Sequence, residues 1–466
     1  MQHFIPIAEV INMKKGPVAF MACICLLLVL AGCGSNSQSA DNGNTGATET
    51  AQPDNSAANG GATEADTITL KLFTALADRS NGAGKVEQQI IDNFMKEHPN
   101  VKIEVEALQD EPYKNKIKVY AASDSMPDIM QVWGQPVFMN PLIDADLLLE
   151  LDPNDFGDKK FVPGAMDGFS KNGKLYGLPR NTDFFVLFYN KKIFADNGVK
   201  TPATLEELKE VSQQLRAKGI NPIAVNGMDG WPLPIWFEYA LQRETGDFDF
   251  MDRAMSGEAS FNDPAVVNAA KYMQELAQEK ALADGFLTAD YGAARNLFGQ
   301  EKAAMYLMGA WEAGLATDEN FSESFRQNVG ALPYPASDKG KLTDVAAWFG
   351  GGYAVSKTTK HPEEAVAFLK YFFDPQNWAK LMWQSGAGFP AQQFDEFLTG
   401  EETNLQKDLI GIFGSMTSSS NTPVLDTSTD KFKQDIMSLH QKLLSGNISP
   451  EEFAKQLDHA AAEARK

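Results

Sequence analysis

Two hydrophobic patterns, one alternating and one helical, follow each other through the first part of the folded chain. Residues 68–73 alternate apolar and polar side chains, which is typical of a half-buried strand. Apolar residues then recur at helical spacing over 86–94, and a second alternating stretch covers 101–105. A helical stretch at 113–122 leads to the run 128–133, which predicts a third, buried strand. The pattern therefore predicts a strand–helix–strand unit followed by a helix and another strand.

The pattern continues in the same style beyond this unit. Residues 184–189 form an unbroken apolar run, which favours a strand inside a sheet because a half-exposed strand would alternate. Thr204 and Glu207 have the spacing of a capping box at the start of a helix. Ser449 followed by Pro450 predicts the start of the last helix. Strands that alternate with helices of this length predict an α/β fold with largely parallel sheets.

The N-terminal segment has a different character. Lys14 and Lys15 precede the uncharged run 17–30, whose length is typical of the apolar region of a signal peptide and short for a transmembrane helix. The run ends in Leu30-Ala31-Gly32-Cys33, which resembles the box where bacterial lipoprotein signals are cleaved. This resemblance implies removal of residues 1–32 and a diacylglycerol, with palmitate-type acyl chains, on the Cys33 sulfur. An uncleaved membrane anchor and an ordinary secretory signal are the alternatives.

The segment that follows Cys33 has a composition unsuited to folding. Residues 34–66 contain one proline and neither an aromatic nor a large aliphatic side chain. Such a segment cannot bury a core, so we expect a disordered tether between the lipidated cysteine and the folded body.

Length and charge limit what the body can be. Beyond residue 66 there remain 400 residues, 67–466, which is long enough to predict two lobes. The net charge of −21 makes nucleic acid and anionic membrane surfaces unsuitable partners. Cys23 and Cys25 lie in the predicted signal segment, so Cys33 is the single cysteine expected after cleavage and an internal disulfide is excluded.

The residue types that carry catalysis are sparse. The four histidines beyond the signal segment do not have the spacing of metal ligands, and the chain contains no Gly-Xaa-Ser-Xaa-Gly motif. The three glycines at 350–352 lack the Lys-Ser/Thr that a phosphate-binding loop requires. We therefore predict no metal, no cofactor and no enzymatic activity, although counting 62 acidic residues cannot exclude a glycosidase-like carboxylate pair.

Several motifs occur in an order that resembles one protein family. These segments are 173–179 (GKLYGLP), 188–198 (FYNKKIFADNG), 201–208 (TPATLEEL), 303–311 (AAMYLMGAW), 350–357 (GGGYAVSK) and 361–370 (HPEEAVAFLK). In this order they are similar to the extracellular solute-binding proteins of family 1, which feed carbohydrate ABC importers. The resemblance extends over about residues 67–389.

The resemblance implies a two-lobed, periplasmic-binding-protein-like fold of type II-like topology, in which hinge segments join two discontinuous lobes around a ligand cleft. It implies crossings near 180–183, 332–335 and 385–390. The expected N-terminal lobe is 67–181 plus 333–385, and the expected C-terminal lobe is 182–332 plus 386–466. The ligand would be enclosed by closure of the hinge.

The expected ligand residues follow from sugar chemistry, because sugar rings stack on aromatic side chains and sugar hydroxyls need carboxylate or amide partners. Trp311 matches the family segment whose tryptophan stacks on a sugar, and Asp78 and Asp183 match positions where the family often places ligand carboxylates. Trp133 and Gln135 follow the third strand, at a carboxyl end where open α/β sheets bind ligands.

The aromatic segment that contains Trp231 and Trp236 gives two further candidates, and we expect one to face the cleft and the other to face the core. Trp348 completes the expected set and depends on where the crossings lie, as do the second-rank candidates Arg180, Asp344, Phe349 and Phe389.

The sequence thus predicts a monomeric, extracytoplasmic, lipid-anchored substrate-binding protein. It would capture a carbohydrate, most simply an oligosaccharide, and deliver it to the permease subunits of an ABC transporter. Three alternatives stay open: the same fold with a non-sugar solute such as a polyol or glycerophosphodiester, a glycoside-active surface enzyme, and a sugar sensor. The identity, length and linkage of the sugar do not follow from the sequence.

Overall fold

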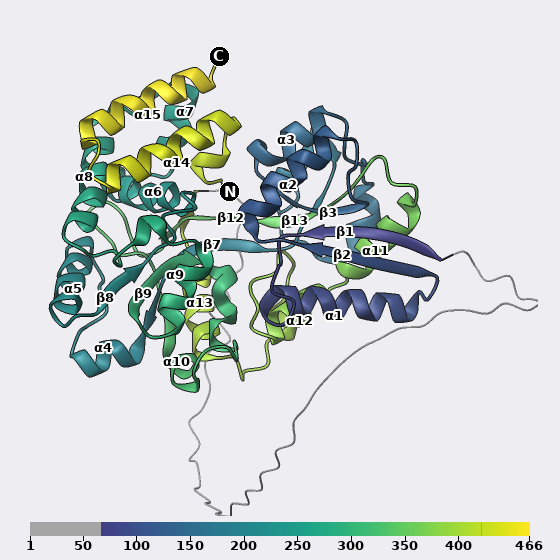
Figure 1. Cartoon of the computed structure of the whole chain (residues 1–466), viewed down its shortest axis with the longest axis horizontal. Helices are drawn as coiled ribbons and strands as arrows, with labels where there is room; N and C mark the ends of the chain where they lie inside the picture. The colour runs from purple at the N-terminus through teal and green to yellow at the C-terminus, as the bar shows by residue number, and fades with distance from the viewer. Residues whose placement is uncertain (1–66, 421) are drawn as a thin grey trace, which may run out of the picture. The chain divides into compact units, whose positions relative to one another are not determined.

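The structure is a computed structural model that describes residues 67–420 and 422–466 (Figure 1). The predicted signal segment 1–32, the lipidation site Cys33 and the predicted tether 34–66 lie outside the described residues.

The first sheet has the strand order β2-β1-β3-β13-β6. Its strands are β1 (Ile68–Thr74), β2 (Val101–Ala107), β3 (Ile129–Trp133), β6 (Leu178–Pro179) and β13 (Gly351–Val355). Strands β1, β2 and β3 are parallel, and β13 pairs antiparallel with both β3 and β6. The strand–helix–strand unit predicted from the hydrophobic pattern is confirmed.

Helices cover both faces of this sheet, as Figure 1 shows. On one face lie α1 (Gly82–Glu97), α11 (Pro362–Phe372) and α12 (Trp378–Gln384), and on the other lie α2 (Asp110–Ala122) and α3 (Pro136–Asp144). Phe94 of α1 packs edge-on against Phe368 of α11, with ring centroids 5.1 Å apart. Phe73 of β1 stacks on Tyr113 of α2, with ring centroids 4.1 Å apart. The sheet therefore has a hydrophobic core on each face.

The second sheet has the order β10-β7-β9-β8, with β12 also paired to β7. Its strands are β7 (Thr182–Asn190), β8 (Asn221–Ala224), β9 (Ala303–Gly309), β10 (Val329–Leu332) and β12 (Ala347–Phe349). Strand β7 lies between β9 and β10 and is almost wholly buried, which confirms the predicted interior strand.

The prediction of largely parallel sheets is wrong for the second sheet. Only β8 and β9 are parallel, whereas β7 runs antiparallel to β9, β10 and β12. The reason is that β7 enters this sheet directly from the first one and therefore runs away from the edge toward which β8 and β9 point.

The second sheet is surrounded by the remaining helices. These are α4 (Lys191–Asn197), α5 (Leu205–Ala217), α6 (Pro232–Thr245), α7 (Asp249–Ser256), α8 (Pro264–Gln278), α9 (Tyr291–Gly299), α10 (Glu323–Asn328), α13 (Asn404–Gly414), α14 (Asp430–Leu444) and α15 (Pro450–Ala464). The Thr204–Glu207 capping box forms at α5, and Ser449 caps α15 with Pro450 in its first turn. Both helix starts were thus correctly predicted.

Shorter elements complete the fold. They are β4 (Ser170–Lys171), β5 (Lys174–Leu175), β11 (Asp344–Val345), β14 (Ser418–Ser419), η2 (Pro153–Lys159), η3 (Asp167–Phe169), η4 (Phe286–Thr288), η5 (Ala310–Ala316), η6 (Asp395–Phe397) and η7 (Val424–Asp426).

The chain passes between the two sheets at three places. The first passage is at Arg180 and Asn181, between β6 and β7. The second lies between β12 and β13, at Gly350, and differs from the expected position at 332–335. Residues 333–349 stay with the second sheet because Tyr334 is buried there, where its ring stacks on Tyr239 at 4.5 Å.

The third passage is longer than expected. Trp378 and Met382 of α12 belong to the core of the first sheet, whereas Trp383 on the same helix belongs to the core of the second. We call the segments around the first sheet the first part and those around the second sheet the second part. Beyond the predicted range 385–390, Gln392 Nε2 still donates to the carbonyls of Lys159 and Phe373 in the first part. This passage therefore runs from α12 to about Phe394, which packs on Trp383.

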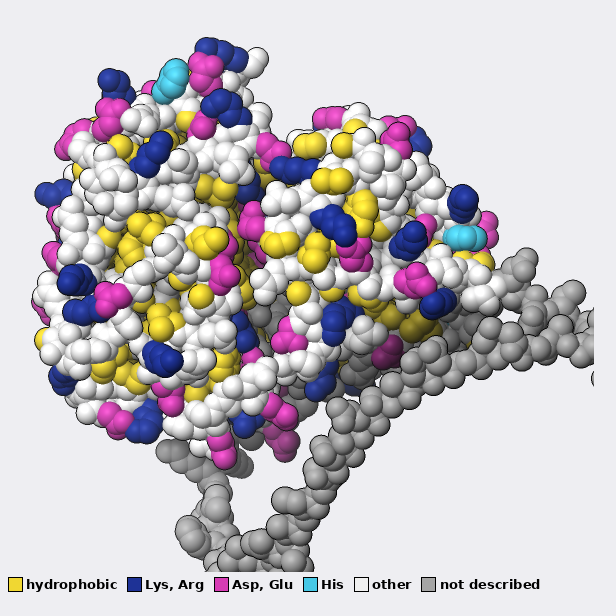
Figure 2. Space-filling model, in the orientation of Figure 1, with side chains coloured by type: hydrophobic (Ala, Val, Ile, Leu, Met, Phe, Trp, Pro, Cys, Tyr) yellow, Lys and Arg dark blue, Asp and Glu magenta, His cyan; other side chains and the backbone are white. Residues whose placement is uncertain are grey.

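At a distance from these three passages, an ion pair joins the first part of the chain to the second part. Lys118 Nζ of α2 lies 2.7 Å from Asp430 Oδ2 at the start of α14, and α3 lies against η7 beside it. In the same orientation as Figure 1, Figure 2 shows a groove between these two parts of the surface, with acidic and basic side chains along it.

Candidate functional site

Four aromatic side chains cluster at one end of the second sheet. Phe185 of β7 is the centre, with ring centroids of Trp231, Trp311 and Trp348 at 6.3, 5.7 and 6.1 Å. Trp311 also lies 5.9 Å from Trp231 and 6.2 Å from Trp348. Trp231 and Trp311 are half-buried and Trp348 is 8% exposed, so the first two keep ring surface available for a ligand.

Local backbone geometry explains how these rings meet. Trp311 follows β9 in η5, and its indole lies over Gly309, where a Cβ would be only 2.0 Å from the ring. Only glycine at this position lets the indole lie across the end of the strand. Trp231 reaches the same place from the residue that precedes α6.

Trp236, the second candidate of the same segment, points the other way. It is 1% exposed and its indole N–H donates to the Tyr334 hydroxyl at 2.6 Å. Its ring and its polar atom are both occupied inside the core. Of the pair that the sequence could not separate, Trp231 therefore faces the aromatic cluster and Trp236 the core.

Asp183 is a buried carboxylate beside this aromatic cluster. It lies two residues before Phe185 on β7, so both side chains project from the same face of the strand. It is 7% exposed, and its Oδ1 atom has no hydrogen-bond partner among the described residues. Burial raises the pKa of Asp183 to about 7, although the neighbouring Arg180 guanidinium acts in the opposite direction.

Two consecutive glycines make room for the charged groups at this crossing. A Cβ on Gly350 would lie 1.5 Å from Asp183 Oδ2, and a Cβ on Gly351 would lie 3.1 Å from Arg180 Nη2. Both head groups therefore rest against bare backbone. The Gly350 amide also donates to the Asn181 carbonyl at 3.0 Å, which ties β12 to the first passage.

At the edge of the first sheet that faces the second sheet, polar side chains hydrogen-bond to one another. Arg180 Nη1 donates to Gln131 Oε1 at 3.3 Å and to the Tyr353 hydroxyl at 3.1 Å. Gln131 Oε1 also accepts from the Ala75 amide at 3.0 Å and lies 3.2 Å from the Thr74 hydroxyl oxygen. The carboxyl ends of β1 and β3 are thereby joined to the passage between the sheets.

Glu87 of α1 is the buried acid of this network. Its carboxylate pairs with Arg79, accepts from the Thr74 hydroxyl at 3.0 Å and lies 3.9 Å from Arg180 Nη1. Burial raises the pKa of Glu87, while the charges of Arg79 and Arg180 and the hydrogen bonds from Arg79 and Thr74 act to lower it. The arginines thus share one buried counter-ion.

The other predicted residues of the first sheet have local partners. Asp78 is exposed, and its Oδ1 accepts from the amides of Ser80 and Asn81 at 2.9 and 3.2 Å, as in a turn ahead of α1. Burial raises the pKa of Asp78, but these hydrogen bonds outweigh it and the net shift is downward. Gln135 is buried, and its Nε2 donates to the Phe349 carbonyl at 3.3 Å.

Trp133 is half-buried at the carboxyl end of β3, where Lys114 Nζ lies 5.1 Å from its ring centroid. The structure thus brings Trp231, Trp311, Trp348 and Asp183 together. It places Gln135 at the β12–β13 passage and gives Asp78 a turn-capping role.

Some of the second-rank candidates lie at the passages between the sheets, and the others lie in the interior of the second part. Arg180 and Phe349 lie at the passages, whereas Asp344 accepts from Gln242 in the interior and Phe389 packs against Phe184. Gln131 and Glu87 were not singled out from the sequence. Glu87 carries a usable signal, because it precedes Ile90, Ile91 and Phe94 by three, four and seven residues and so lies on their buried helix face.

Further observations limit the chemistry. Over residues 67–420 and 422–466, no group of three His, Cys, Asp or Glu side chains is arranged to hold a metal ion. Within the same ranges, no helix combines the length and apolar character needed to cross a membrane.

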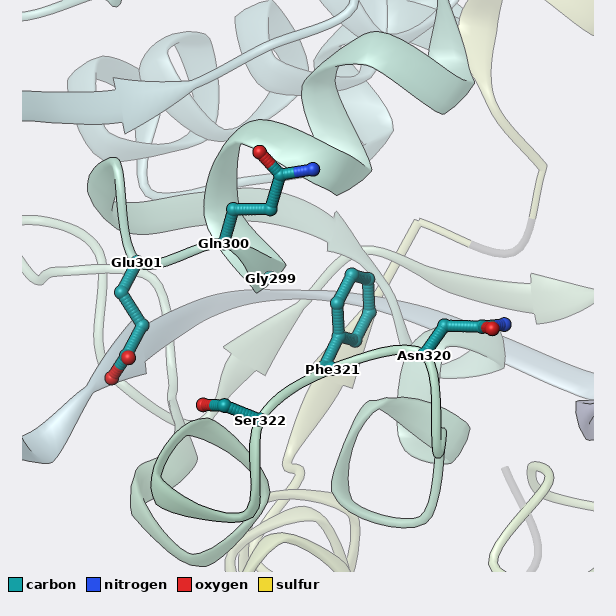
Figure 3. A pocket seen from close by; sticks show the side chains of 6 residues that line it. All are labelled: Gly299, Gln300, Glu301, Asn320, Phe321 and Ser322. Atoms are coloured by element: carbon teal, nitrogen blue, oxygen red, sulfur yellow. The ribbon is translucent and has the colours of Figure 1, made fainter. Parts of the chain in front are cut away.

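A surface cavity of about 250 Å³ lies elsewhere on the second part (Figure 3). It is lined by Gly299, Gln300, Glu301, Asn320, Phe321 and Ser322. The first three precede β9 whereas Trp311 follows it, so the cavity lies at the opposite end of that strand from the aromatic cluster.

Comparisons with known proteins agree with this architecture. The family model described as bacterial extracellular solute-binding protein matches residues 78–377. An arabinooligosaccharide-binding protein of Bacillus subtilis is 26% identical over 402 residues, covering 84% of this chain and 83% of that protein. A multiple sugar-binding protein of Streptococcus mutans is 24% identical over 317 residues, covering 66% and 71%.

Among solved structures, one from work on xylan utilization by the thermophilic bacterium Caldanaerobius polysaccharolyticus is similar with a TM-score of 0.77 and 29% identity. The match covers 84% of this chain and 99% of that one. A chitin oligosaccharide binding protein matches with a TM-score of 0.76 at 23% identity, over 86% and 99%, and supports the fold alone. The predicted two-lobed α/β fold is confirmed, and the chain belongs to the bacterial extracellular solute-binding protein family, whose members bind solutes for ABC transporters rather than transform them.

Proposed function

We propose that this protein binds a neutral oligosaccharide outside the cell and delivers it to the permease of an ABC transporter. The single observation that carries the proposal is the aromatic cluster of Trp231, Trp311, Trp348 and Phe185 beside the carboxylate of Asp183. This carboxylate lies on the same strand face as Phe185, and its Oδ1 atom has no hydrogen-bond partner among the described residues. Indoles match the C–H faces of sugar rings, and a carboxylate matches sugar hydroxyls.

In this proposal Trp231 and Trp311 stack on sugar rings, because their faces are the more exposed ones. Asp183 accepts a hydroxyl hydrogen at the passage between the sheets. Trp133 and Gln135 approach the ligand from the carboxyl end of β3, and Asp78 borders the site through the loop that follows β1. Trp236 is left out because it is fully engaged in the core.

The charges of the site favour a neutral ligand. Arg79 and Arg180 are balanced by Glu87 and Asp183. Arg79 already hydrogen-bonds to side chains of α1, and Arg180 already hydrogen-bonds to side chains of the first sheet. A phosphate or uronate would need free cations, so this balance argues against a glycerophosphodiester. The relatives named for arabinooligosaccharides and multiple sugars support a carbohydrate.

We also propose that the body is anchored by a lipid on Cys33 and acts as a monomer. The anchor would keep the protein near its permease and raise the effective concentration of loaded protein there. Replacing Cys33 by alanine should leave binding by the purified protein intact and reduce uptake by cells, measured with radiolabelled sugar.

A thermal-shift screen tests the central proposal. The protein from residue 67 onward is heated with xylo-, arabino-, malto-, chito- and raffinose-type oligosaccharides, with polyols and with glycerophosphodiesters. A ligand at 100 times its Kd should add about 2.7 kcal/mol to the stability of the folded state. Stabilisation by a non-sugar solute alone would refute the carbohydrate assignment, and release of shorter sugars on incubation would favour the alternative of a glycoside-active enzyme.

A further inference from the structure

Asp183 occupies an unusual electrostatic position for a carboxylate. It lies at the start of β7, next to Gly350, with its Oδ2 atom against the backbone and its Oδ1 atom without a hydrogen-bond partner among the described residues. A buried carboxylate is normally compensated by donors or cations. Here Arg180 is the one charged group among residues 67–420 and 422–466 that acts on it.

Within the described part of the chain, the other elements around Asp183 supply no compensating charge. Strand β12 pairs Trp348 with Asp183, Gly350 lies against the Asp183 Oδ2 atom, and Pro390 of the third passage bridges to Asn181. The Tyr353 hydroxyl of β13 is bound to Arg180 rather than to Asp183.

The compensating cation is itself shared with other groups. Arg180 donates to Gln131 and Tyr353, and it faces Glu87, which also pairs with Arg79. Its charge is therefore divided between two acids. The effect of burial on Asp183 therefore outweighs the opposing effect of the Arg180 charge, and the pKa of Asp183 is raised to about 7.

We propose that a ligand hydroxyl donates its hydrogen bond to the ionised carboxylate of Asp183, and that ligand capture thereby releases one proton from this residue to solvent. The inference rests on the proposed function and adds its regulation. The hydroxyl hydrogen stays on the ligand oxygen, and the proton that leaves is the one held by the Asp183 carboxyl before binding. A hydrogen bond to the charged form favours that form, because charge-assisted bonds are about twice as strong as neutral ones.

The sign of the pH dependence follows directly. The free protein holds a proton on Asp183 below about pH 7, and the complex prefers the ionised form, so affinity rises with pH through this range. If the pKa in the complex lies below about 5, the Kd should be about tenfold higher at pH 6 than at pH 8. About 0.9 proton should be released per ligand at pH 6 and about 0.1 at pH 8.

Titration calorimetry tests this with the sugar that stabilises the protein most in the thermal-shift screen. Binding is measured from pH 5.5 to 8.5, and at each pH in two buffers of different ionisation enthalpy. The difference between the two binding heats gives the number of protons released per ligand bound. The expected result is proton release that rises as the pH falls. A Kd independent of pH, or zero proton release at pH 6, would overturn the inference while leaving the proposed function intact. Absence of carbohydrate binding at every pH would instead overturn the proposed function.

Two variants assign the proton to a residue. D183N should reduce affinity at pH 8 and flatten the pH profile. The matched control is E238Q, because Glu238 of α6 is 2% exposed, has one unpartnered oxygen and has a pKa raised well above its usual value by burial. E238Q should keep the wild-type profile. Should D183N bind too weakly to measure, the proton count of the wild-type protein still decides.

An unchanged slope in D183N, or a slope lost in E238Q, would contradict the assignment to Asp183.

Discussion

The facing edges of the two sheets contain different chemistry. At the edge of the first sheet, Glu87, Gln131 and Arg180 are linked to one another by hydrogen bonds and ion pairs. At the edge of the second sheet, Trp231 and Trp311 form an aromatic surface beside a carboxylate that has an unpartnered oxygen. The polar side chains of the first edge bind mainly one another, although Arg180 Nε has no hydrogen-bond partner among the described residues. The second edge is apolar apart from the carboxylate of Asp183, whose Oδ1 atom has no such partner among the described residues.

This difference suggests a division of roles. A buried network in which most polar atoms are paired resists movement, since each member loses its partner if another moves. The first edge therefore holds the backbone at the passage between the sheets. The second edge offers indole ring faces and a carboxylate oxygen, and a bound ligand would give these groups the contacts and the hydrogen bond that they lack. Three substitutions test this comparison.

The largest effect is expected at Glu87. E87Q removes the shared counter-ion of Arg79 and Arg180, so that Arg79 loses its paired acid and the buried Arg180 keeps only Asp183 as a neighbouring acid. Loss of one partner from a buried ion pair costs about 3–5 kcal/mol. The free energy of unfolding, measured by urea denaturation followed by circular dichroism, should fall by about 3 kcal/mol or more.

The matched control for Glu87 is E104Q, because Glu104 of β2 pairs with Lys102 on the exposed surface. This variant should leave the urea midpoint unchanged. Equal stability of E87Q and the wild-type protein would show that the network is not a structural element, and the proposed division of roles would fail.

The next effect is expected at Trp311. W311A removes the indole that contacts Phe185, Trp231 and Trp348, and with it a stacking surface worth about 2 kcal/mol. The Kd for the sugar, measured by calorimetry, should rise about 30-fold. Its control, W236F, should keep the Kd and lose about 1 kcal/mol of stability through the broken bond to Tyr334. Affinity lost in W236F but kept in W311A would reverse the assignment of the two tryptophans.

The smallest effect is expected at the ion pair between Lys118 and Asp430. Both side chains are more than half exposed, so the pair is screened by water and salt. K118E should raise the Kd less than about fivefold, and the exchange K118E/D430K should restore it. If the double variant binds no better than K118E alone, this pair does not help to hold the two parts together around the ligand.

Much of the first half of the fold could be predicted from local pattern. The strand 68–73, the apolar run 184–189 and the capping box at Thr204 all depend on side chains near in sequence, and each forms as predicted. The second passage was misplaced because Leu332 to Pro335 looks like an exit from the sheet. The burial of Tyr334 against Tyr239, a contact across 95 positions of the chain, keeps that segment in the second part.

The candidate site shows the same limit. The sequence identified Trp311 and Asp183 through motifs, and it reduced Trp231 and Trp236 to a pair with opposite roles. It could not say which one faces the cluster, because α6 is buried on nearly every side and both positions read as apolar. Glu87 was missed for a related reason, since one of its two arginines, Arg180, comes from a distant segment.

The sequence by itself determined the class of this protein: family motifs in order, an α/β pattern, and a predicted lipid-linked N-terminus. These depend on short-range spacing and on residue type. Only the tertiary structure decided the passages between the sheets, the direction of each indole and the burial of the Asp183 carboxylate beside the aromatic cluster. The physical reason is that burial and the sharing of counter-ions depend on which distant segments meet, and residue spacing does not encode this.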